Sequence, residues 1–230
     1  MFNVNCSMLN VIYEDKNILA VDKPAGILVY YPPHFKQNEE TLLDEVFEKL
    51  EYKNKDERTG VVHRLDRETS GVIIFAKNEA AEIELKKVFK ERKIKKYYVA
   101  LVSGKLEPEE GRITIPLGRA PKDRLRVVPK ASGKPSETLY RVLKYYPNAN
   151  VSLLEIELKT GRMHQIRVHL SAIGHPVVGD KIYGGSTSIK LDRQFLHAKK
   201  LEFVSPFDKK NIVIESELPK DLTEFLDDQY

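Results

Sequence analysis

In the stretch Val62–Gly71, VHRLDRETSG, the carboxylate of Asp66 stands between Arg64 and Arg67, with His63 just before them. The Thr-Ser-Gly that follows is typical of a turn. Two interpretations of this stretch are open. In the first, the aspartate is a surface turn residue that takes part in a salt bridge. In the second, it is a catalytic acid, and the surrounding cations hold a polyanion above it.

A second group of cations lies between Arg119 and Lys134, in RAPKDRLRVVPKASGK. This run contains six Lys or Arg and one Asp, and its two prolines and one glycine predict a loop. A solvated charged loop is the ordinary interpretation of such a run. A phosphate-binding loop is the alternative, because several cations can release counterions from a nucleic-acid backbone. Its candidate contacts are Arg119, Arg124 and Arg126.

Composition is that of a soluble globular protein. Of 230 residues, 41% are hydrophobic and 31% are charged, and the net charge of +4 allows a nucleic-acid partner without requiring one. The single cysteine, Cys6, excludes a disulfide framework and a thiolate zinc site. We see no signal-peptide pattern and no apolar run long enough to span a bilayer. We therefore expect a cytoplasmic protein that does not bind membranes.

Apolar runs predict a chain rich in strands. A continuous run such as residues 72–77 suits a buried strand, and the alternation of Leu154, Ile156 and Leu158 with charged residues suits a half-buried one. We predict strands at residues 11–14, 18–23, 72–77, 96–102, 138–146 and 151–159, and a hairpin over residues 200–216. Asp66 is thereby placed in a turn just before a core strand, which is a rigid position for a catalyst.

Capping residues and 3.6-residue periodicity predict a few helices. Residues 41–44 resemble a capping box, Asn78 can cap a second helix, and a short acidic helix ends the chain. A further helix is expected within residues 160–176, with a core stripe of Met163, Ile166, Leu170 and Ile173. Strands mixed with helices without regular βαβ alternation predict an α+β fold. No linker or composition shift divides residues 1–230, so we expect a single domain.

Several common chemistries lack their sequence motifs. The Gly-rich phosphate-binding patterns, the G-x-S-x-G elbow and the H-E-x-x-H zinc motif are all absent from the sequence. A glycosidase needs two opposed carboxylates, and only Asp66 stands out. We therefore expect no metal site.

Five blocks, in this order, resemble the RluA-type pseudouridine synthases, which isomerise uridine in ribosomal or transfer RNA. They are VIYEDKNILAVDKPAGILV, VHRLDRETSGVIIFAK, KKYYVALV, KTGRMHQIRVHLSAIGHPVVGDKIYG and FLHAKKLEF. Five ordered blocks are far more specific than one short motif. The resemblance implies the pseudouridine synthase fold: a central mixed, mostly antiparallel sheet with flanking helices and an RNA-binding cleft. It also implies a protein without metal or organic cofactor.

The resemblance assigns roles to individual residues. Asp66 matches the essential aspartate, Tyr98 the tyrosine that stacks on the target uracil, and Arg167 the arginine that pairs with the aspartate. Arg64 matches the arginine associated with filling the gap left by the flipped base. We expect RNA contacts from His63, Arg64, Arg67, Arg162 and His164, and from Arg119, Arg124 and Arg126 of the basic loop. For the two histidines, hydrogen bonds to the backbone are an equally open role.

Other points stay open at this stage. The aspartate can act as a nucleophile or as a base that removes a sugar proton, and the sequence does not choose between these routes. A catalytically silent RNA-binding module would tolerate loss of the three catalytic candidates, all of which are present. A uracil-excising glycosylase would need a second acid or an activated water. We expect a monomer without the S4-type RNA-binding domain that some relatives carry, and the target RNA is not predicted.

Overall fold

The structure is a computed structural model that describes residues 9–31, 39–53, 56, 58–121, 123, 126–184 and 191–229. Arg124, a predicted RNA contact, lies outside the described residues. Among the described helices, none has both the length and the apolar character needed to cross a membrane.

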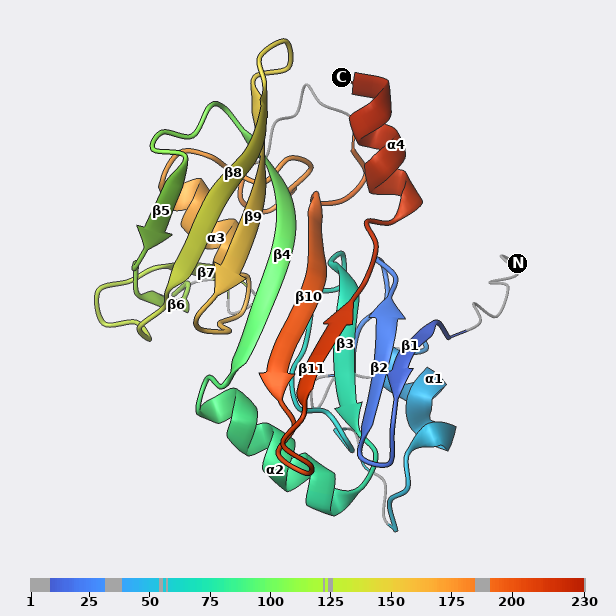
Figure 1. The fold of residues 1–230 in the computed structure, drawn as a ribbon. Helices are drawn as coiled ribbons and strands as arrows, with labels where there is room; N and C mark the ends of the chain where they lie inside the picture. Colours follow the sequence, from blue (N-terminus) through green and yellow to red (C-terminus); the bar gives the residue numbers. More distant parts are fainter. Residues whose placement is uncertain are drawn as a thin grey trace.

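A nine-stranded sheet forms the centre of the protein (Figure 1). Its strand order is β1-β2-β3-β10-β4-β9-β8-β5, and β11 pairs with β10 beside this path. Only the β3–β10 pair is parallel among the described pairings, so the expected mixed, mostly antiparallel sheet is confirmed. The strands are β1 (Val11–Glu14), β2 (Ile18–Lys23), β3 (Ser70–Ala76), β4 (Ile94–Ser103), β5 (Glu110–Ile113), β8 (Thr138–Tyr146), β9 (Val151–Leu158), β10 (Leu196–Val204) and β11 (Asn211–Glu215).

Strand β3 is buried along its whole length, as its continuous apolar run predicts. Ile73 and Phe75 join one hydrophobic cluster, and Val72 and Ile74 join another. Because successive side chains point to opposite faces of a strand, β3 is covered on both faces. It therefore gives the loop that precedes it a rigid support.

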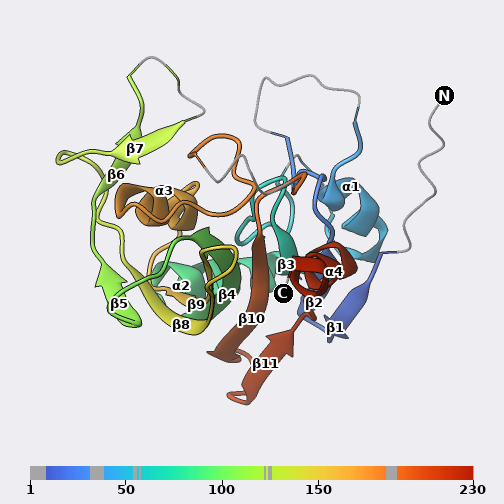
Figure 2. The same ribbon diagram turned by 90° about the horizontal axis from the view of Figure 1, so that it is seen from above.

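The helices begin where the capping residues predict. Thr41 caps α1 (Leu42–Val46), which continues as a short 3-10 turn, η1 (Phe47–Lys49). The side chain of Asn78 accepts a hydrogen bond from Ala81 N–H at the start of α2 (Glu79–Lys90). Seen from above, α1 and α3 lie on the same side of the sheet (Figure 2), and both contribute to the cluster that contains Ile73.

The core stripe predicted for the third helix is partly wrong. Helix α3 (Gln165–Ala172) begins at Gln165, two residues after Met163, and Ile173 lies at its C-terminal end with 36% of its surface exposed. Ile166 and Leu170 are buried as predicted, but Arg167 and His169 are buried as well. Polar partners on neighbouring segments make this possible, and sequence periodicity does not show them.

The basic segment is only in part the loop that its prolines and glycine predict. It contains an antiparallel hairpin of β6 (Leu117–Arg119) and β7 (Val127–Pro129). Leu117 and Val127 are buried in a small cluster with Val168 and Tyr183, which holds the hairpin beside α3. Strand β5 was also not predicted, because its sequence EGRI has only one large apolar residue.

Gly71 brings two strands into close contact. Its φ is +114°, and a Cβ at this position would lie 2.2 Å from the carbonyl oxygen of Ala198 in β10. Only glycine fits this backbone conformation and this approach. The parallel β3–β10 pairing, His197 with Ser70 and Ala198 with Gly71, therefore starts directly after the Asp66 loop.

Candidate active site

The loop that carries Asp66 is held by hydrogen bonds from several distant segments. Lys23 Nζ donates to the carbonyl oxygen of Arg67 at 2.9 Å, and also to those of Pro24 and Ile27. Gln194 Nε2 donates to Thr69 Oγ1 at 3.0 Å. Contacts from both sides therefore fix the backbone on which the carboxylate is mounted.

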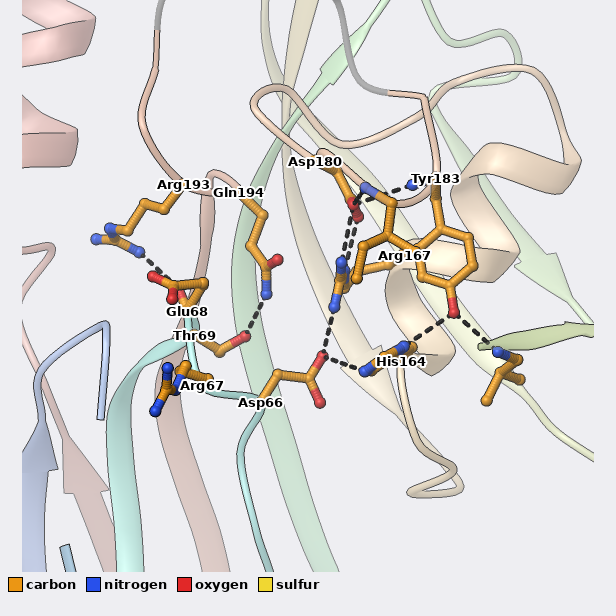
Figure 3. Close-up of polar contacts among 12 residues, drawn as sticks. Asp66, Arg67, Glu68, Thr69, His164, Arg167, Asp180, Tyr183, Arg193 and Gln194 are labelled. Atoms are coloured by element: carbon orange, nitrogen blue, oxygen red, sulfur yellow. Dashed lines mark hydrogen bonds and ion pairs between the residues drawn. The ribbon is translucent and has the colours of Figure 1, made fainter. Parts of the chain in front are cut away.

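The carboxylate of Asp66 points toward Arg167 and away from its sequence neighbour Arg67 (Figure 3). Arg167 Nη1 donates to Asp66 Oδ2 at 3.1 Å, although 101 residues separate them in the chain. Arg67 instead forms an ion pair with Glu39. The cation that neutralises Asp66 thus comes from α3, not from the loop itself.

A second carboxylate fixes the arginine. Arg167 Nε and Nη2 donate to the two oxygens of Asp180 at 2.6 and 2.8 Å, in the bidentate geometry that suits a guanidinium. Asp180 Oδ1 also accepts the backbone N–H groups of Ile182 and Tyr183. The Asp180 side chain is fully buried, while that of Asp66 is 17% exposed. One buried cation therefore joins a hidden carboxylate to one that faces the cavity.

The pKa values follow from this arrangement. Burial by itself would raise the pKa of Asp180, but the hydrogen bonds and charge of Arg167 hold it below its usual value. Burial by itself would lower the pKa of Arg167, and the hydrogen bonds to Asp180 together with both carboxylate charges raise it. Arg167 and Asp180 are therefore both expected to be charged at neutral pH.

His164 and Tyr183 complete this side of the site. The hydroxyl of Tyr183 accepts a hydrogen bond from Val127 N–H and lies 2.9 Å from His164 Nδ1. Burial lowers the pKa of His164, so we expect a neutral ring. A phenol that donates its proton to Nδ1 favours the tautomer with Nε2–H, which lies 3.9 Å from Asp66 Oδ2.

A cavity of about 530 Å³ opens beside Asp66, a size within the usual range for small-ligand sites. Tyr98 of β4 forms part of its wall and is 8% exposed. Burial, and then the nearby Asp66 carboxylate, raise the pKa of the Tyr98 phenol well above its usual value. The phenol is therefore protonated throughout the physiological range. The adjacent Tyr97 lies beneath the ammonium group of Lys200.

The predicted RNA contacts are distributed unevenly. His63, Arg64, Arg162 and His164 line the cavity, whereas Arg67, Arg119 and Arg126 do not. His63 Nε2 accepts the N–H of Ile74, and burial followed by the charge of Lys96 lowers the pKa of His63 to about 3. Its ring is therefore neutral and stacks on Phe89. The roles of these residues in RNA binding stay predictions.

Sequence reasoning gave no role to Asp180, Tyr183 or Lys96. Each of them lies within a block that carries the family resemblance, which was the available signal. No local spacing relates Asp180 to Arg167, because they lie 13 positions apart, one on α3 and the other beyond its end. Among the described residues, no group of three or more His, Cys, Asp or Glu side chains is placed to hold a metal ion.

Comparisons with known proteins identify the family of the chain. The family model described as RNA pseudouridylate synthase matches residues 17–172. The chain is 38% identical over 226 residues to "Ribosomal large subunit pseudouridine synthase D" of Nitrosomonas europaea, covering 95% of this chain and 64% of that protein. It is 43% identical over 187 residues to an "Uncharacterized RNA pseudouridine synthase" of Aquifex aeolicus, covering 78% of this chain and 57% of that protein. The chain thus spans less than two thirds of the length of these two relatives.

A solved structure of similar fold points to the same family. "Human RNA Pseudouridylate Synthase Domain Containing 1" matches with a TM-score of 0.74 and 30% sequence identity, over 95% of this chain and 87% of that one. Asp66, Tyr98 and Arg167 all lie within the matched residues. The predicted resemblance is confirmed, and the chain belongs to the RNA pseudouridylate synthase family.

Proposed function

We propose that this protein converts uridine to pseudouridine in structured RNA, with Asp66 as the essential acid. The observation that carries the proposal is the Asp66–Arg167 pair at a cavity of nucleotide size with Tyr98 on its wall. A target uridine must leave its helix or loop to enter such a cavity. Stacking on Tyr98 would contribute about 1–3 kcal/mol toward holding the base there.

The reaction moves one bond of the base. The N1–C1′ bond breaks, the uracil turns, a C5–C1′ bond forms, the hydrogen on C5 leaves as a proton, and N1 takes up a proton. Asp66 either attacks C1′ as a nucleophile or removes a sugar proton as a base, and both routes need an ionised carboxylate. Arg167 supplies a counter-charge to that carboxylate in a partly buried site. The cavity walls retain the detached uracil, since otherwise water would capture the sugar.

Ribosomal RNA and transfer RNA are the proposed substrates. The printed name of the Nitrosomonas relative refers to the ribosomal large subunit, which makes ribosomal RNA the first substrate to test. We further propose that residues 1–230 act in the cytoplasm as one catalytic domain and as a monomer.

Tritium release from RNA labelled at uridine C5 tests the proposal. Wild type should release the label from ribosomal or transfer RNA, because C5 loses its hydrogen only when the base is reattached through that carbon. Asp66→Asn should release none while it still binds RNA. Glu84→Gln is the matched control, since Glu84 is an exposed carboxylate on α2 outside the cavity lining. No release by wild type from either RNA class would point to a silent binding module instead.

A further inference from the structure

The end of the cavity formed by α2 and the start of β4 is rich in cations. Across the whole lining, Lys and Arg occur eight times, whereas Asp66 is the only carboxylate among the described residues there. Three of the cations come from one short segment at this end: Lys90, Arg92 and Lys96. A surface with this balance of charge attracts an anion.

These three cations have no carboxylate partner among the described residues, and they also lack the other contacts that hold Arg64 over the ring of Tyr30 and Arg162 at the carbonyl oxygen of Pro135. Lys86 is paired with Glu82, and Lys159 with Glu157. Lys90, Arg92 and Lys96 form no ion pair or side-chain hydrogen bond with any residue that the structure describes. Their charge is therefore available to a ligand.

Lys96 is the least exposed of the three. A Cβ built on Gly161 would lie 3.6 Å from Lys96 Nζ, so the missing side chain at Gly161 leaves the ammonium open to the cavity. Burial, and then the charge of Arg92, lower the pKa of Lys96 to about 8. A partly buried, unpaired ammonium beside another cation is unfavourable until an anion binds.

The position of Lys96 relative to Tyr98 suggests which anion this is. Residues two apart on a strand point to the same face, about 7 Å from each other. Both side chains line the cavity from β4. A nucleotide whose base lies against Tyr98 carries its phosphates a comparable distance away, at the rim of the cavity.

We propose that Lys96, together with Lys90 and Arg92, binds a backbone phosphate of the RNA strand next to the target uridine. The choice of RNA as the ligand rests on the proposed function. In this arrangement Arg167 serves the catalytic carboxylate, and Lys96 serves the substrate. The phosphate contact would hold the flipped nucleotide by its backbone while the uracil is detached from the sugar.

Binding of a fluorescent nine-residue oligouridylate to the full chain tests the site. Lys96→Met should bind about tenfold more weakly at low salt. The slope of log Kd against log salt concentration should decrease by the equivalent of nearly one phosphate contact. Lys95→Met is the matched control, because Lys95 is its exposed neighbour on β4, lies near Glu202 and is outside the cavity lining. It should bind within about twofold of wild type.

The same titration at several pH values adds a second readout. Wild-type affinity should fall as the pH rises through about 8, because Lys96 loses its charge. Lys96→Met should lack this change, which separates Lys96 from any other titrating group. The charged or titratable groups around Lys96 are Lys90 of α2, Arg92 of the following turn, His63 of the loop before β3, and Lys159 and Arg162 of the segment after β9.

Activity assays separate this inference from the proposed function. In tritium release, Lys96→Met should raise KM about tenfold and leave kcat within about threefold, without lowering the melting temperature. Equal affinity, salt dependence and KM in wild type and Lys96→Met would overturn the phosphate site and leave the isomerase proposal intact. Weaker binding by Lys96→Met with no tritium release by wild type would support the phosphate site and contradict the isomerase.

Discussion

Two groups of cations line the same cavity and differ in their partners. Arg167, on α3, is bonded to Asp66 and Asp180, and its side chain is 5% exposed. Lys90, Arg92 and Lys96, at the α2 end, have no carboxylate partner among the described residues. A paired cation fixes the position and charge of a catalytic group, whereas an unpaired one leaves its charge for the substrate.

Removing the paired cation should have the largest effect. Arg167→Met would leave the buried Asp180 without its counter-charge, and losing one partner of a buried pair lowers the free energy of unfolding by about 3–5 kcal/mol. Asp66 would also lose the hydrogen bond and counter-charge of Arg167, so tritium release should fall by at least about a hundredfold. Urea denaturation and single-turnover tritium release measure the two effects.

Arg162→Met is the control for stability in that experiment. Arg162 also lines the cavity, but the one hydrogen-bond acceptor of its guanidinium among the described residues is the carbonyl oxygen of Pro135, at 3.4 Å. We expect its unfolding free energy to stay within about 0.5 kcal/mol of wild type. Similar losses of stability in the two variants would remove the distinction between paired and unpaired cations.

Replacing Asp180, the buried carboxylate, should have the next largest effect on stability. Asp180→Asn keeps the shape of the side chain but loses charge-assisted hydrogen bonds to Arg167, each worth about 1.5–3 kcal/mol. Because the pKa of Asp180 is lowered in the folded state, its contribution is present at neutral pH and is lost as the pH falls through its folded-state value. Wild type should therefore lose its stability advantage over Asp180→Asn in acid, as followed by urea denaturation between pH 7 and pH 3.

A dependence of opposite sign, with the advantage growing in acid, would show that Asp180 is protonated in the folded protein. Catalysis provides an independent check, because a displaced Arg167 should lower kcat more than it raises KM. We expect the decrease in kcat to be about tenfold.

The sequence predicted the parts of this site that local patterns or the family resemblance can show. A continuous apolar run located the strand beside Asp66, and Asn78 located the start of α2. The H-Q-I-R block pointed to the pairing of Arg167 with the aspartate. Asp180 was not predicted as a second partner of Arg167, because it reaches the arginine only when the segment after α3 folds back. Tertiary contact, not spacing, makes that choice.

The loop prediction for the basic segment was partly wrong for the opposite reason. Its charges and prolines dominated the pattern, while two buried residues, Leu117 and Val127, decide its structure as a hairpin. Lys96 is a third kind of case. It stands out because it has no carboxylate partner among the described residues, and no sequence pattern shows the lack of a partner.

Arg193 is an intermediate case between the two groups of cations. It is almost fully buried and paired, but its partner Asp221 on α4 (Lys220–Gln229) is about half exposed. Arg193 Nη1 also donates to the carbonyl oxygen of Glu68, next to the turn that follows Asp66. Arg193→Ala should therefore lower stability by about 1–2 kcal/mol and tritium release several-fold, measured by the same two assays.

Asp221→Asn is the informative companion to that variant. It removes the charge of Asp221 and leaves the Arg193 side chain and its bond to Glu68 in place. We expect at most about half of the stability loss of Arg193→Ala, because water screens an exposed partner. Equal losses in the two variants would mean that the bond to Glu68 contributes little.

The smallest effect should come from the cations of the hairpin. Arg119 and Arg126 are exposed, and neither lines the cavity, although Arg126 lies over the ring of Tyr183. If they contact phosphates at the edge of a long RNA, the Arg119→Ala/Arg126→Ala double variant should bind structured RNA a few-fold more weakly at low salt and release tritium with an unchanged kcat. The nine-residue oligouridylate is too short to reach both the cavity and the hairpin, so its affinity should not change. A loss that is equal for the short and the long RNA would place the hairpin at the cavity itself, and no loss for either would make it the solvated charged segment that its composition also allows.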